Sequence, residues 1–331
     1  MEFAKKINGA VFFVDVLGFG ALTQNKLDLK DVHFKPWLKS LKKKLYFIEY
    51  TNQFLAASIL VTFRDILKKT IDDFKDVKVA QLSDCAFAWS ENISNMVIFV
   101  NNFMTRATCK GLLCRGGLSY GEIIETEESN NDNYSLGKFI LGEAVTNAVK
   151  LEGRPKGCKV LINQELPSEL SKQDEKFYSQ IVHMFQPFTN LIDYSIYDEF
   201  KWYLIPMLNK KINTINIPIN DKVKYTQERL KIAANLRCGA KFLWNDSSKE
   251  GHTHINASLD FLTDYDDKIF KIWHDFRWES TDYYSGDDSL RSYGRLKSLK
   301  KAIKELSHYK FVEENTTKNK IERIFHDIKF K

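Results

Sequence analysis

The sequence has few cysteines, and their spacing offers no paired motif. Five occur among 331 residues, an odd number, and no two of them form a CxxC spacing. A disulfide framework relies on paired cysteines in an oxidising compartment, and a structural zinc site relies on closely spaced Cys or His ligands. The sequence therefore predicts reduced thiols in a cytoplasmic protein, at Cys85, Cys109, Cys114, Cys158 and Cys238.

Long hydrophobic runs and a strong net charge are missing as well. The longest apolar-rich run, residues 54–63, is about half as long as a helix that crosses a bilayer, and the first residues lack the hydrophobic segment of a signal peptide. The formal charge of +6 is small for this length, and the helix expected at 288–309 spreads its Lys and Arg residues around most of its circumference. We therefore expect no membrane and no nucleic acid among the partners.

The sequence does contain the apolar material for a large core, since 44% of its residues are hydrophobic and 24 are Phe. In the first half, strand-like runs and helical periodicities follow the order β-α-β-β-α-β, then α-β. That order predicts an α+β, ferredoxin-like (split βαβ) domain with helices on one face of a mainly antiparallel sheet. The expected strands are 10–15, 77–82, 85–89, 112–124 and 157–163, and the expected helices are 52–74, 94–109 and 142–152.

Two further segments differ in composition. Residues 23–44 are polar and basic, and we expect an inserted, exposed segment there. Beyond about residue 170 the patterns are mostly helical, with stretches at 227–244, 255–278 and 288–309. The sequence thus predicts two units, 1–168 and a mainly helical extension, 169–331, that packs on the first unit or on a dimer interface.

The most informative local stretch is residues 10–20. An unbroken apolar run ends in Asp15, and Gly18 and Gly20 follow it. Such a run is typical of a strand buried on both faces, where a carboxylate is costly unless it is paired or holds a metal. Glycines let the backbone turn and bring its N–H groups near an anion. Two interpretations follow: a site where a metal and a phosphate meet, or an Asp that caps a turn.

Four stretches together resemble the catalytic domain of the class III nucleotidyl cyclases. Phe13–Gly20 is similar to the family's metal-binding strand and phosphate loop, FxDIxGFT, and Leu82–Cys85 is similar to its IGD hairpin tip. Arg115–Glu122 resembles its RVGIHTGE strand, and Gly142–Glu152 resembles its GDxVNxAARLE helix. The likeness covers roughly residues 8–163. It implies the family's fold and its reaction, in which a ribose 3′-oxygen attacks the α-phosphate and expels pyrophosphate.

The resemblance also implies a set of ligands. Asp15 and Asp84 would hold two divalent cations, Mn²⁺ or Mg²⁺, which neutralise the triphosphate and lower the pKa of the 3′-hydroxyl. Hard oxygen ligands suit these ions, and Val16 is the third residue that the resemblance assigns to the metals. The backbone N–H groups of the loop would cradle the phosphates, which adds Leu17, Gly18, Phe19 and Gly20 to the expected site.

Several positions depart from the family's pattern. Its adenine-selecting Lys falls on Ala80 and its second purine-selecting residue falls on Phe139, so neither side chain can hydrogen-bond a purine edge. A Phe can instead stack on a smaller base. Together with the Arg115–Gly117 stretch, this pairing resembles the bacterial pyrimidine cyclases of the Pycsar anti-phage system. It implies conversion of CTP or UTP into cyclic CMP or cyclic UMP, which a separate effector protein would sense.

The expected catalytic helix is altered too. The family's transition-state Asn and Arg fall on Thr146 and Lys150, which keep one hydrogen bond and the positive charge. Arg115 either contacts base or phosphate or forms a surface salt bridge, and Tyr120 either contacts the base or packs in the core. In this family the metal ligands and the base-reading helix belong to opposite subunits, so the resemblance implies a homodimer with composite active sites.

Two other functions remain open at this stage. One is a purine cyclase of the same fold, acting on ATP or GTP. The other is a catalytically inactive cyclase-like module that binds a nucleotide or a partner; the presence of both Asp15 and Asp84 argues against it. The choice between cytosine and uracil is not visible in the sequence.

Overall fold

The computed structural model describes residues 4–41, 50–126, 129–131, 134–189, 196–211 and 219–262. The helix expected at 288–309 lies outside these ranges, and so does most of the one expected at 255–278. Within the described ranges, no helix has both the length and the apolar character needed to cross a membrane.

One mixed sheet runs through the molecule, in the order β2-β3-β1-β4-β8-β10-β9, with β7 paired to β4. All its pairs are antiparallel except β4 with β8. The α+β fold class expected from the sequence is therefore confirmed. The strands are β1 Ala4–Val16, β2 Lys78–Leu82, β3 Cys85–Ser90, β4 Cys114–Thr126, β7 Ile140–Leu141, β8 Val160–Ile162, β9 Phe185–Thr189 and β10 Ile196–Phe200, beside a separate pair, β5 Ser129–Asn131 and β6 Tyr134–Leu136.

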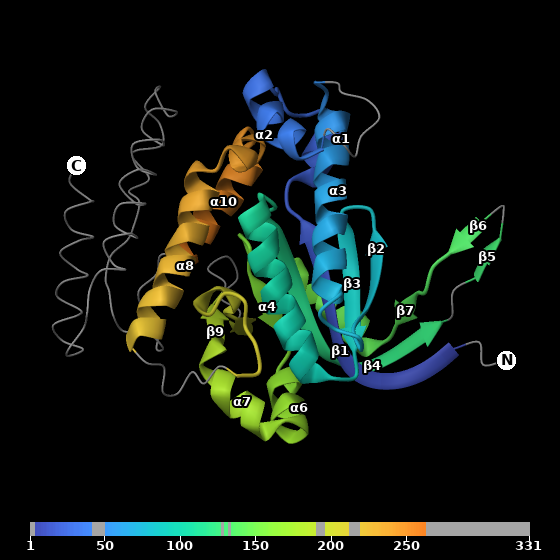
Figure 1. Cartoon of the computed structure of the whole chain (residues 1–331). Coiled ribbons are helices and arrows are strands. Elements are labelled where there is room, and N and C mark those ends of the chain that lie inside the picture. Colours follow the sequence, from blue (N-terminus) through green and yellow to red (C-terminus); the bar gives the residue numbers. More distant parts are fainter. Residues whose placement is uncertain are drawn as a thin grey trace.

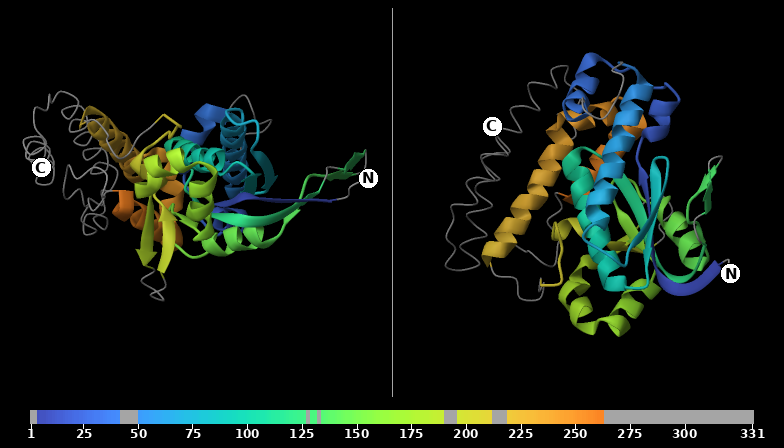
Figure 2. Two further views of the ribbon diagram at one scale, coloured as in Figure 1. Left: turned by 90° about the horizontal axis from the view of Figure 1, so that it is seen from below. Right: turned by 45° about the vertical axis from the view of Figure 1, so that its right-hand side comes forward.

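The central strand β1 is buried on both faces, which explains its continuous apolar run. Phe12 and Val14 belong to the main core, under the helices α3 (Asn52–Ile71) and α4 (Ile93–Lys110). Val11 points to the other face, where α5 (Glu143–Glu152) packs with Ala144 and Ala148. The views in Figures 1 and 2 show α3 and α4 side by side over the sheet. The expectation that the helices cover one face alone is wrong, because α5 covers the opposite one.

The segment expected to be exposed at 23–44 is partly core, as far as residue 41, where its description ends. Residues Asp31–Leu41 form α2, and its Phe34 and Trp37 are 2% and 0% exposed. These two apolar residues are three apart on a helix and therefore share its inner face. The run of lysines at 42–44 lies outside the described residues.

The second half of the chain adds both helices and strands. Its strands β9 and β10 extend the sheet beyond β8, so that the sheet continues across both halves of the sequence. We did not expect these strands, because their Gln, Pro, Asp and Glu residues break the apolar alternation. The helices are α6 Glu165–Gln173, α7 Glu175–Ile181, α8 Ile219–Cys238, α9 Leu243–Asp246 and α10 Lys249–Leu262, with 3-10 turns at Val182–Met184, Trp202–Leu204 and Ala240–Phe242.

Two hydrogen bonds hold α10 against the chain that leads into β8. His254 Nδ1 accepts from the N–H of Gly157 at 3.0 Å, and Ser258 Oγ accepts from the N–H of Cys158 at 2.9 Å. Burial, followed by the charges of Arg115 and Lys156, lowers the pKa of His254 to about 4, although Glu250 raises it. The imidazole is therefore neutral in the folded protein near neutral pH.

We expect this histidine to make the protein less stable in acid. As the pH falls below about 6.5, His254 takes up a proton in the unfolded chain before it does so in the folded one, so the free energy of unfolding decreases. His254→Asn keeps an acceptor near the Nδ1 position without a titratable group. Between pH 7 and pH 4.5 the variant should lose up to about 2.5 kcal/mol less than the parent protein. Urea unfolding at both pH values measures this, and equal losses in the two proteins would contradict it.

Candidate active site

Asp15 and Asp84 lie next to each other at one end of the sheet. Asp15 is the penultimate residue of β1 and pairs with Cys85 of β3. Asp84 occupies the tight turn between β2 and β3, and its carbonyl accepts a hydrogen bond from the N–H of Val16 at 3.1 Å. The turn is sharp because Ser83 has a φ of 56°, in the left-handed region. Two carboxylates that the sequence separates by 69 positions, 15 and 84, are thus neighbours.

The surroundings of Asp15 are short of positive charge. Burial raises the pKa of its carboxyl to about 7, and the charges of Glu152 and Asp84 raise it as well. Arg115 and a hydrogen bond from Val16 act in the opposite direction and do not compensate. Like charges held close together in a partly buried site oppose ionisation, and a bound cation would relieve that repulsion.

Arg115 is held by a buried ion pair. Its Nε donates to Glu152 Oε1 at 2.7 Å and its Nη1 donates to the carbonyl of Pro155 at 2.8 Å. The side chains of Arg115 and Glu152 are only 14% and 10% exposed. Arg115 thus forms a salt bridge, but inside the protein and not on the surface as one of its two interpretations had it. Glu152 was missed as a site residue, although the resemblance had placed it at the end of the expected helix.

The oxygen atoms present fit a hard divalent cation. The carboxylates of Asp15 and Asp84 and the carbonyl of Val16 are the donor types that Mg²⁺ and Mn²⁺ prefer. Burial, and then the charges of Glu152 and Asp84, raise the pKa of Asp15, and a bound cation would oppose both effects. In the described ranges, no group of three or more His, Cys, Asp or Glu side chains is arranged to hold a metal.

The loop after Asp15 is clamped at Leu17. Its N–H donates to the carbonyl of Leu113 at 2.8 Å, and its carbonyl accepts from Asn245 Nδ2 at 3.1 Å. The N–H of Leu17 is therefore not available to a phosphate, which leaves Gly18, Phe19 and Gly20 of the expected four. The helix α1, Phe19–Thr23, begins directly behind this loop.

Gly18 is required by the geometry of this loop. Its φ of 85° lies in the left-handed region, and a Cβ at this position would lie 3.3 Å from the ring of Trp244. Trp244 and Asn245 are both 1% exposed. Nothing in the sequence pattern pointed to these two residues as neighbours of the loop.

The residues expected on the catalytic helix lie on its exposed side. Thr146 and Lys150 are exposed on α5, on the side opposite Ala144 and Ala148. The hydroxyl of Thr146 donates to the carbonyl of Gly142 at 3.1 Å. Lys150 borders a cavity of about 230 Å³, which is also lined by Asn147, Leu151, Arg154 and Asn163. Within the chain as described, neither residue is brought to Asp15.

The residues expected to read the base lie in different surroundings, and only Ala80 belongs to the edge of the smaller apolar cluster. Ala80 packs there with Phe13 and Phe87, whose rings are 4.7 Å apart. Phe139 precedes β7 and is 52% exposed. Tyr120 is partly buried against the main core, and its backbone N–H donates to Asn163 Oδ1 at 2.9 Å. Tyr120 thus packs against the core, and its contact with a base stays a prediction.

Comparisons with known proteins return only distant likenesses. No protein-family model matches the chain, and a search of curated proteins gives no match. Among solved structures, the guanylyl cyclase Cya2 has a TM-score of 0.40 at 10% identity, over 59% of this chain and 93% of that one. A bacterial light-regulated adenylyl cyclase has a TM-score of 0.40 at 15% identity, over 60% and 53% of the two chains. The adenylyl cyclase CyaB from P. aeruginosa has a TM-score of 0.38 at 15% identity, over 59% and 95%. Likenesses at this level do not transfer an activity to this chain.

Proposed function

We propose that this protein is a nucleotidyl cyclase that converts CTP or UTP into the 3′,5′-cyclic monophosphate and pyrophosphate. The observation that carries the proposal is the meeting of Asp15 and Asp84 in a site with excess negative charge, beside a glycine-containing loop. This supports the metal interpretation of Asp15 over the simple turn cap. Four sequence stretches in the family's order support the same reaction.

Each group has a defined task in that reaction. The carboxylates of Asp15 and Asp84, with the carbonyl of Val16, would hold the cations, and the N–H groups of Gly18 to Gly20 would bind the triphosphate. When bound, the cations supply the charge that neutralises the phosphates and lowers the pKa of the 3′-hydroxyl. The ion pair between Arg115 and Glu152 holds these two side chains in place beside Asp15. The chain itself thus binds, orients and shields the reacting groups.

The proposed preference for a pyrimidine rests on the apolar edge of the base-reading region. Ala80, Phe13 and Phe87 offer no hydrogen-bonding side chain, and Phe139 is free to stack on a base. The polar atoms on the edge of a purine would find no hydrogen-bonding partner among these side chains. Turnover of ATP or GTP on the same fold is the competing proposal, and it needs other residues to read the base.

The proposed partner is a second copy of the chain. Thr146 and Lys150 face outward on α5, so a site that uses them needs a carboxylate pair from another subunit. Exposed apolar side chains lie on α5, at β7 and at the end of β2: Val149, Phe139, Leu141 and Leu82 are 41%, 52%, 47% and 59% exposed. A homodimer would cover such apolar surface. The cyclic product would then act on a separate effector in anti-phage defence.

The test is turnover of each nucleotide by the purified full chain. ATP, GTP, CTP and UTP are incubated separately with Mn²⁺, and cyclic product is scored by mass spectrometry, with Asp84→Ala as the blank. We expect product from CTP or UTP alone, lost in the variant. Product from ATP or GTP would favour the purine proposal. No product from any nucleotide would favour a module that only binds.

A further inference from the structure

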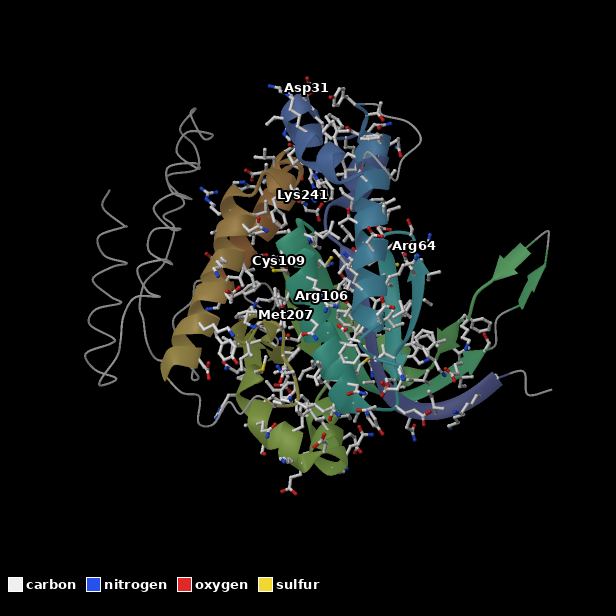
Figure 3. All side chains as sticks on the ribbon, in the orientation of Figure 1. Asp31, Arg64, Arg106, Cys109, Met207 and Lys241 are labelled. Atoms are coloured by element: carbon white, nitrogen blue, oxygen red, sulfur yellow. The ribbon has the colours of Figure 1, made fainter. Side chains whose placement is uncertain are left out.

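A second cavity lies between α4 and α8, and none of its lining residues belongs to the site at Asp15. Its volume of about 660 Å³ falls in the range of small-molecule sites, roughly 300–1,000 Å³. Figure 3 shows Arg106, Cys109 and Met207 grouped between the two helices. The remaining lining residues are Thr105, Lys110, Pro206, Asn209, Lys224, Tyr225, Glu228, Lys231, Ile232 and Asn235.

The charge of this lining is unbalanced. Lys231 pairs with the only lining carboxylate, Glu228, at 2.6 Å, and Arg106 pairs with Asp73 at 2.8 Å. Lys110 and Lys224 have no acidic partner in the part of the chain that the structure describes. Burial, and then the charge of Lys110, lower the pKa of Lys241, a further lysine outside the lining. An anion bound in the cavity would offset the charge of the unpaired lysines.

A buried hydroxyl in the lining also lacks a partner. Thr105 is 5% exposed, and its Oγ1 forms no hydrogen bond in the described structure. The other threonine of this turn, Thr108, donates to the carbonyl of Met104 at 3.0 Å, as helical threonines commonly do. Because this oxygen is itself closed to solvent, an occupant of the cavity would meet the side chain of Thr105 without reaching its hydroxyl.

The floor of the cavity is held in an unusual backbone conformation. Met207 has a φ of 60°, which is rare for a residue other than glycine, and its side chain is 42% exposed. Buried Asn101 fixes the chain on both sides: its Nδ2 donates to the carbonyl of Ile205 at 3.0 Å, and its Oδ1 accepts from the N–H of Leu208 at 2.7 Å. The apolar side chain is thus kept in the lining.

We propose that this cavity binds a small organic anion, about the size of a mononucleotide. Its phosphate, sulfonate or carboxylate group pairs with Lys110 on α4 or Lys224 on α8. Its apolar or aromatic part packs against Met207 and Ile232. Because the site shares no residue with the carboxylate pair, this binding does not depend on the proposed cyclase activity.

The experiment uses the aromatic sulfonate 8-anilinonaphthalene-1-sulfonate as the probe with the full-length protein. Fluorescence titration should give one saturable site per chain. The double variant Lys110→Glu/Lys224→Glu should bind the probe with at least about tenfold lower affinity than the parent protein. A matched variant, Lys26→Glu/Lys75→Glu, changes two exposed lysines elsewhere by the same charge and should bind as the parent does.

The alkylation rate of Cys109 shows whether the probe binds in the cavity. Its thiol is exposed at the cavity, so saturating probe should slow its alkylation by N-ethylmaleimide at least about fivefold in peptide mass spectra, because the occupant blocks access. This measurement needs only the parent protein. Unchanged alkylation, no saturable binding, or equal loss of affinity in both double variants would overturn the proposal.

Discussion

Asp15→Asn is expected to remove cyclic-nucleotide formation, with a loss of at least about a thousandfold, and at the same time to stabilise the metal-free protein at pH 8. The pKa of Asp15 is raised from 3.8 to about 7 in the folded protein. The folded chain therefore binds this proton more tightly than the unfolded chain, and the free energy of unfolding falls as the pH rises from about 4 to 7. Asparagine does not ionise, so the free energy of unfolding of the variant does not fall in this way as the pH rises.

The gain in the free energy of unfolding should be about 2–4 kcal/mol at pH 8 and should shrink as the pH is lowered toward 5. Urea unfolding at the two pH values measures it. Asp28→Asn, at an exposed position, serves as the control and should change neither activity nor stability. A variant at Asp15 that turns over nucleotide, or that is less stable than the parent at pH 8, would contradict this account.

The same variant tests the proposed composite site. Asp15→Asn and Lys150→Ala are each expected to be inactive as homodimers. In a mixed dimer, one site receives the intact carboxylate pair from one subunit and the intact α5 from the other, so mixing the two proteins should restore part of the activity. Activity that stays absent in isolated mixed dimers would mean that each chain builds its own site.

Gly117→Ala is expected to be strongly destabilising. A Cβ at Gly117 would lie 2.0 Å from the carbonyl oxygen of Ala148 and 2.8 Å from the backbone nitrogen of Glu152. Both atoms belong to the backbone of α5, so no side-chain rotation can make room and the whole helix must move. We expect a loss of about 3 kcal/mol or more in the free energy of unfolding.

The matched control lies on the same strand, under the same helix. At Gly121 a Cβ would come no closer than 3.4 Å to Ala144, an ordinary contact, so Gly121→Ala should cost less than about 1 kcal/mol. Urea unfolding of both variants gives the comparison. Similar losses at the two positions would show that the general cost of replacing a glycine in β4, rather than the contact with α5, decides the result.

The sequence located the parts of the site that depend on local pattern. Helical periodicity placed α3 and α4 within a few residues of their bounds, because long amphipathic stretches repeat their signal many times. Asp15 was recognisable because a charge at the end of a buried strand is rare. The closeness of Asp84 came from the resemblance, and the turn at Ser83 supplies its physical reason.

The parts that were missed depend on contacts distant in the sequence. Asn245 reaches Leu17 across 228 positions, and no local pattern signals such a pair. In the sequence, Glu152 is an ordinary acidic residue at the end of a helix, and only the structure shows that it pairs with Arg115. Strands β9 and β10 carry too many polar residues for strand periodicity to show, because their place in the sheet is decided by β8.

The sheet shared by the two halves has a practical consequence for dissecting this protein. A chain shortened to end near residue 168 would keep every residue of the four family-like stretches, yet it would uncover the edge of β8 that β10 now pairs. An unpaired strand edge invites aggregation. It would also lose Trp244 and Asn245, and with them the packing on Gly18 and the hydrogen bond to the carbonyl of Leu17. An inactive fragment of that length would therefore say nothing about the chemistry of the intact chain.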